Sequence, residues 1–233
     1  MLRTPAWART WSVLRLAMSA VIATAIVAQL SLSVSRAVER GNDVGTIVAN
    51  FFSFFTILSN AASVVVLAWA AIWYFTRGAR AKSEPRGLAI ALASVTTYMI
   101  VTGLVYNTLL RNIELPQGST PIPWSNETLH VIAPIFLLLD LFLGPLRRRL
   151  NWSAVFAIAV FPIVWAVYTL VRGPLVTNPI NGNPYWYPYP FMDPNNFANG
   201  YLGVAVYIVA IAVAIMAVGV LVVWIGRRRG TPL

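Results

Sequence analysis

Six long apolar stretches constrain what this chain can fold into. Each is about as long as the roughly 20 residues that an α-helix needs to cross the hydrocarbon core of a bilayer. The segments between them are short or rich in Pro, Gly and Asn, so one transmembrane domain takes up essentially all of residues 1–233. The sequence therefore predicts an all-α polytopic membrane protein with six transmembrane helices. The spans are expected near residues 13–34, 51–75, 87–110, 126–146, 152–171 and 201–225.

The composition agrees with a membrane protein and excludes several enzyme classes. Only 10% of the residues are charged and 58% are hydrophobic, whereas an ordinary soluble domain carries roughly a quarter charged residues. The chain has no cysteine and one histidine, which excludes disulfides, thiolate metal sites and a structural zinc. We therefore expect no metal and no other cofactor.

The basic residues predict the orientation in the membrane. Most of them precede the first span, follow the sixth, or lie in the second-to-third and fourth-to-fifth loops, whereas the opposite loops carry few basic residues and most of the acidic ones. By the positive-inside rule both termini are expected to be cytoplasmic. Because the basic residues are spread over four short segments, they argue against nucleic-acid binding despite a net charge of +10. The first group is Arg3, Arg9, Arg15, Arg77, Arg80, Lys82, Arg86, Arg147, Arg148, Arg149, Arg227, Arg228 and Arg229; the second is Arg36, Arg40, Arg111 and Arg172, with Glu39, Asp43, Glu114, Glu127 and Asp193.

The longest loop, residues 172–200, is expected on the outer side. Its prolines prevent a regular helix, yet its aromatic side chains are too apolar for a solvated linker. We expect it to fold back onto the membrane surface. It then serves either as a cap over the helix ends or as a lid over a lipid-accessible pocket.

Polar side chains recur along the second span at helical spacing. Ser53, Thr56, Ser59, Asn60 and Ser63 are three or four residues apart and so share one helical face. Such a face either lets neighbouring helices pack closely or contributes to a site, because polar groups in lipid need a partner or a purpose.

The fourth span carries the single histidine. Counted from the expected helix starts at 1.5 Å per residue, Thr56 lies about 8 Å deep and His130 about 6 Å deep, so the two are expected at one level. Glu127 or Asn126 could orient His130 from the same helical face. Pro134 is expected to leave the carbonyl of His130 without its helical donor and to kink the span.

Three more polar residues lie near the ends of the spans. Asn107 and Arg111 are one turn apart at the outer end of the third span, near the level of His130. Asp140 follows His130 by ten residues, about 15 Å along a helix, which is too far for an orienting contact. We expect Asp140 to be structural and to pair with a hydroxyl, a tryptophan or an arginine.

Three segments together resemble the bacterial branch of the androgen-induced-gene family of multi-span membrane proteins. They are residues 50–60 (NFFSFFTILSN), residues 129–134 (LHVIAP) with 138–140 (LLD), and residues 187–194 (YPYPFMDP). Animal members of that family are intramembrane threonine hydrolases that cleave fatty acid esters of hydroxy fatty acids. The resemblance implies Thr56 and His130 as the catalytic pair, and a place in the cytoplasmic membrane of a bacterium.

The chemistry of these residue types is consistent with ester hydrolysis. A threonine hydroxyl needs an adjacent general base at neutral pH, and a histidine suits that task. Asn60 and Asn107 are candidate donors to the oxyanion, with Ser59 in a supporting place. Arg111 either binds a substrate carboxylate or reaches phospholipid headgroups.

Two functions therefore stand. The first is an integral membrane hydrolase that cleaves a lipid ester through Thr56 and His130, in a site toward the outer leaflet. The second is a non-catalytic membrane protein that binds or moves a lipid or a small amphiphile through the same pocket.

Overall fold

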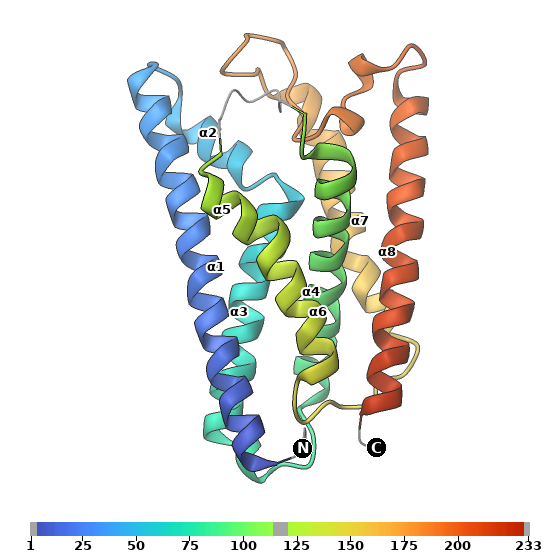
Figure 1. Ribbon diagram of the computed structural model, residues 1–233. Helices are drawn as coiled ribbons and strands as arrows, with labels where there is room; N and C mark the ends of the chain where they lie inside the picture. The colour runs from blue at the N-terminus through green and yellow to red at the C-terminus, as the bar shows by residue number, and fades with distance from the viewer. Residues whose placement is uncertain (1–3, 114–120, 231–233) are drawn as a thin grey trace.

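The computed structural model describes residues 4–113 and 121–230, and its elements in these ranges are all helical. Six long helical segments stand side by side in a bundle (Figure 1). The long helices are α1 (Pro5–Glu39), α3 (Phe55–Thr76), α4 (Arg86–Val105), α6 (Ala133–Leu143), α7 (Ala154–Arg172) and α8 (Tyr201–Arg229). The shorter α-helices are α2 (Val44–Phe51) and α5 (Pro123–Glu127), and two π-helical turns are η2 (Tyr106–Leu110) and η3 (Thr128–Ile132). The 3₁₀ turns are η1 (Gly78–Arg80), η4 (Gly173–Leu175), η5 (Pro190–Met192) and η6 (Pro194–Asn196).

Six segments in the described ranges are long and apolar enough to cross a membrane, which confirms the predicted fold class. The third span joins α4 to η2, and the fourth joins α5, η3 and α6 into one segment. Arg3 and Glu114, two of the charges used to predict the orientation, lie outside the described residues. The spans are Pro5–Glu39, Phe55–Thr76, Arg86–Leu110, Pro123–Leu143, Ala154–Leu175 and Tyr201–Arg229.

Both ends of the chain lie at the same end of the bundle (Figure 1). We call this the terminal end and the opposite one the far end. An even number of spans produces this arrangement. That this side is cytoplasmic stays a prediction from the basic residues.

The beginning of the second span differs from the expected 51–75. The segment is broken at residues 52–54, so Phe51 ends α2 and a new helix begins at Phe55. The break is stabilised from α7, because the indole of Trp165 donates to the carbonyl of Ser53 at 2.9 Å and the Tyr168 hydroxyl lies 3.0 Å from that of Ser53. Non-helical backbone at membrane depth is tolerated where protein groups satisfy it in this way. Thr56 therefore lies in the first turn of α3 and not in the middle of a longer helix.

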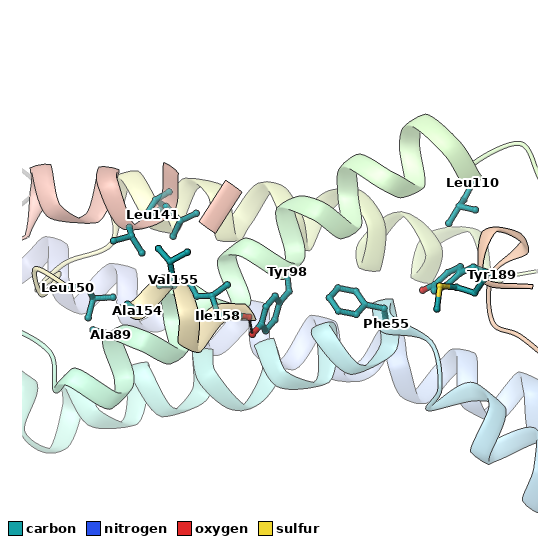
Figure 2. Packing of buried hydrophobic residues seen from close by; sticks show 14 of the residues in the cluster. Phe55, Ala89, Tyr98, Leu110, Leu141, Leu150, Ala154, Val155, Ile158 and Tyr189 are labelled. Carbon is teal, nitrogen blue, oxygen red and sulfur yellow. Dashed lines mark hydrogen bonds between the residues drawn. The ribbon is translucent and has the colours of Figure 1, made fainter. Parts of the chain in front are cut away.

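The core runs along the bundle around α4, which is the most buried of the six spans, whereas α8 is the least buried. Figure 2 shows one buried cluster extending from Ala89 and Leu150 to Leu110 and Tyr189. Within it the Tyr98 hydroxyl donates to the carbonyl of Ile158 at 2.8 Å, which joins α4 to α7. Partners of this kind are needed by polar groups buried in an apolar interior.

A buried ionic cluster fixes α1 against α6 near the terminal end. The carboxylate of Asp140 is fully buried. It accepts from Arg15 at 2.7 Å and from Arg147 at 2.6 Å, and the Trp11 indole donates to it as well. Asp140 is thus a structural residue, with an arginine and a tryptophan among its partners as expected.

Candidate functional site

A cavity of about 330 Å³ lies between α3, α4, α7 and α8. Its wall is almost entirely hydrocarbon, and no charged side chain among the described residues lines it. The exceptions are the hydroxyls of Thr56, Thr102, Tyr106 and Tyr189 and the Trp165 indole, which is already bonded to Ser53. A volume and lining of this kind suit an apolar ligand with a few polar atoms.

The loop before α8 closes one side of this cavity. Residues Tyr189, Phe191 and Met192 are buried and form part of its wall. Tyr189 packs edge-on against Phe54 and stacks on Phe191. The loop therefore packs onto the helices and builds part of the cavity itself.

Thr56 and Tyr189 meet at the start of α3. The Tyr189 hydroxyl lies 3.3 Å from the Thr56 hydroxyl and accepts from the Thr56 backbone N–H at the same distance. The N-cap residue of α3, Phe54, has no side chain able to cap, so the phenol oxygen of Tyr189 takes that role from another part of the chain. The Thr56 hydroxyl is therefore at a helix N-terminus, where partial positive charge favours a developing anion.

Tyr189 is a site residue that sequence reasoning did not single out. Burial raises the pKa of Tyr189 above its ordinary value, while its hydrogen bonds with Thr56 and with the backbone of Phe55 act in the opposite direction. The phenol is thus neutral at physiological pH and can donate its proton in a hydrogen bond. The available signal was its place among prolines and aromatics in a loop too apolar for solvent.

His130 lies in the π-turn η3, behind the cavity wall. Its ring stacks on Tyr106 with 3.8 Å between the ring centroids, and Tyr106 in turn lines the cavity. His130 Nδ1 lies 2.9 Å from the carbonyl of Asn126. Because a carbonyl only accepts, Nδ1 carries the proton and Nε2 of the neutral ring is left as the basic nitrogen. Of the two predicted orienting residues, Asn126 is the one in contact, through its backbone.

Asn107 donates to the carbonyl of His130, which Pro134 is predicted to leave without its helical donor. Its side-chain amide donates to the carbonyl of Gly103 at 2.7 Å and to the carbonyl of His130 at 3.2 Å. The second bond supplies the donor that Pro134, which has no N–H, cannot give. Asn107 thus holds η2 against η3, with its amide group engaged by backbone.

Asn60 and Ser59 connect α3 to its neighbours. The Asn60 amide donates to the carbonyls of Thr56 at 2.9 Å and of Leu129 at 3.1 Å, so one side chain ties the backbone of Thr56 to the residue before His130. Its Oδ1 is buried without a hydrogen-bond partner among the described residues. The Ser59 hydroxyl donates to the carbonyl of Thr56 and lies 3.2 Å from the Thr102 hydroxyl.

Arg111 and Glu127 form an ion pair beside His130. Their nearest N–O distance is 3.0 Å, and both side chains are partly exposed. Arg111 also donates to Asn107 Oδ1 at 2.9 Å and lies over the Tyr106 ring. The residues Asn107, Arg111, Glu127 and His130 therefore belong to one connected group, as their common level suggested, whereas Asp140 is near the terminal end.

No family model, curated protein or solved structure matches this chain. The resemblance to the androgen-induced-gene family therefore stays a prediction from the three sequence segments.

Proposed function

We propose that this protein is an integral membrane hydrolase that cleaves a lipid ester with Thr56 as its nucleophile. The observation that carries the proposal is the place of Thr56, which lines an apolar cavity at a helix N-terminus with its hydroxyl beside that of Tyr189. A fatty acid ester of a hydroxy fatty acid fits the chemistry of the wall, since it is hydrocarbon apart from its ester and its carboxyl group.

The proposed reaction is acyl transfer through the threonine. Thr56 Oγ1 attacks the ester carbonyl, its proton passes to Nε2 of His130, and the alcohol leaves with that proton. Water then hydrolyses the acyl-threonine and releases the fatty acid. The oxyanion is stabilised by the hydroxyl of Tyr189 and by the partial positive charge at the start of α3. Since the Tyr106 ring covers His130, this reaction requires Tyr106 to turn aside when the substrate binds.

The second candidate is a protein that binds a lipid without cleaving it. Two contacts favour this function: the Thr56 hydroxyl is hydrogen-bonded to Tyr189, and the ring of His130 is stacked on that of Tyr106. In that case Thr56 and Tyr189 hold a polar group of the ligand by hydrogen bonds.

Turnover of a long-chain ester by the purified protein separates the two functions. We expect Thr56→Val to lower the rate at least about 100-fold, because the nucleophile is gone, and Thr56→Ser to keep a measurable rate. Thr102→Val is the matched control, since it removes another hydroxyl from the same cavity. Full activity in Thr56→Val contradicts the hydrolase. Saturable binding of an ester that is recovered intact from wild type supports the second candidate.

A further inference from the structure

A second, smaller cavity lies at the far end, between the end of α1, α2 and the loop before α8. Its volume of about 60 Å³ suffices for a small polar group of a few atoms and not for an acyl chain. Arg36, Arg40 and the amide side chains of Asn42 and Asn50 line it, with the Trp186 ring on the loop side. It contains no acidic lining residue in the described part of the chain.

A third arginine contacts two residues that line this cavity. The guanidinium of Arg172 lies over the Trp186 ring at 5.3 Å and donates through one nitrogen to Asn50 Oδ1 at 2.7 Å. Its other terminal nitrogen is buried without a hydrogen-bond partner among the described residues. Two lining residues thus hold a third cation directly behind the cavity wall.

The two nearby carboxylates accept hydrogen bonds from groups outside the cavity. Glu39 accepts from the Ser35 hydroxyl at 3.2 Å, and Asp43 caps α2 by accepting from the Thr46 N–H at 2.6 Å. Neither lines the cavity. Two arginines therefore line a space with room for one anionic group, and a third is bonded to residues of its wall.

The cavity lies at the depth of lipid headgroups. Helix α1 has 35 residues, which gives a length of about 52 Å, whereas the hydrocarbon core is about 30 Å thick. Its last turn with Arg36, and Arg40 after it, therefore extend beyond the core. Arg172 likewise ends the apolar helix α7.

We propose that this cavity binds a phosphate group, with Arg36 and Arg40 as its cationic ligands and Arg172 as a positioning residue that holds Asn50 and Trp186. Guanidinium groups match the oxygens of phosphate with paired donors. The phosphate belongs either to the headgroup of an anionic phospholipid or to inorganic phosphate. The site does not depend on the cavity at Thr56 and stands whether or not that cavity is catalytic.

Binding of phosphatidylglycerol to the detergent-purified protein, followed by native mass spectrometry and by thermal unfolding, tests the proposal. We expect Arg40→Gln to weaken binding about tenfold, because one charge-assisted contact is lost. Arg40 is exposed, so the variant should fold. Arg86→Gln removes one exposed positive charge outside the cavity and should change binding less than twofold. Arg172→Gln is the second test of the site.

Inorganic phosphate as a separate ligand distinguishes the two sources. If phosphatidylglycerol alone raises the unfolding temperature and needs Arg40, the site takes a headgroup. If inorganic phosphate does so with the same need for Arg40, the site takes the free ion. Equal binding of both ligands by wild type, Arg40→Gln and Arg172→Gln overturns the proposal, and so does an equal loss in Arg40→Gln and Arg86→Gln.

Discussion

The hydroxyls of Thr56 and Tyr189 are hydrogen-bonded to each other, and each has a different role in the proposed reaction. Thr56 is the residue that changes its covalent state, whereas Tyr189 remains a phenol that caps α3 and donates to the oxyanion. The pKa of Tyr189 is raised by burial, so the phenol keeps its proton throughout the physiological range. A hydrogen-bond donor held in an apolar cavity stabilises an oxyanion more strongly than a donor in water does.

The substitution Tyr189→Phe tests the role of the Tyr189 hydroxyl as oxyanion donor and helix cap. It removes the hydroxyl and leaves the ring stacked on Phe191. We expect ester turnover to fall about 100-fold from the loss of one oxyanion donor, and the free energy of unfolding to fall by about 1 kcal/mol from the loss of the cap. Kinetic assays and thermal unfolding in detergent measure the two effects.

Tyr187→Phe is the matched control for that change. Tyr187 is in the same loop, but its hydroxyl lies 3.3 Å from that of Tyr201 and not in the cavity. We expect its turnover to stay within about twofold of wild type, as for a change remote from the reacting atoms. Equal losses in the two variants would assign the effect to the loop and not to the hydroxyl at Thr56.

At the level of elements, the contact between α4 and the fourth span positions His130. Gly103 on α4 packs directly against Pro134, next to the carbonyl that Asn107 supports. A Cβ at position 103 would lie 3.0 Å from Pro134 Cβ and 3.3 Å from the carbonyl of His130. The absence of a side chain therefore allows the two π-turns to meet.

The change Gly103→Ala should push these segments apart. We expect the free energy of unfolding to fall by about 1–3 kcal/mol, as for overpacking in a tight interior, and turnover to fall with it. Thermal unfolding in detergent provides the comparison with Gly226→Ala, where a Cβ meets nothing within 4 Å. That control should be as stable as wild type or more so, because alanine favours a helix. A stable, fully active Gly103→Ala protein would show that this contact does not position His130.

The elements also show how far sequence reasoning reaches in this molecule. The six spans followed from hydrophobicity and length, and the free carbonyl of His130 followed from Pro134. The break at residues 52–54 could not be predicted, because the Trp165 and Tyr168 side chains that stabilise it come from α7, more than a hundred residues away. The contact of Tyr189 with Thr56 could not be predicted for the same reason, because this loop residue reaches Thr56 only in the folded chain.

At the scale of the whole molecule, the prediction to be tested is the orientation in the membrane. The basic residues near the terminal end predict that this end is cytoplasmic. The chain has no cysteine, so a single introduced cysteine reports its own side. Asn151 lies between α6 and α7 near the terminal end, Asn181 lies in the loop at the far end, and both side chains are exposed.

Labelling of whole cells with a membrane-impermeable maleimide checks the prediction. We expect Asn181→Cys to react in intact cells and Asn151→Cys to react after the cells are broken. The two variants are matched, because each replaces an exposed asparagine by the same residue. The reverse pattern would place the termini outside and move the Thr56 cavity toward the cytoplasmic leaflet.

An activated Thr56 is the central claim, and a fluorophosphonate probe tests it most directly. The purified protein is labelled in detergent and in lipid, and the adduct is located by mass spectrometry in wild type, His130→Ala and Thr102→Val. We predict an adduct on Thr56 that is lost in His130→Ala and kept in Thr102→Val. An unlabelled Thr56 in folded wild-type protein whose cavity still binds an ester, or an adduct that persists without His130, would contradict the claim.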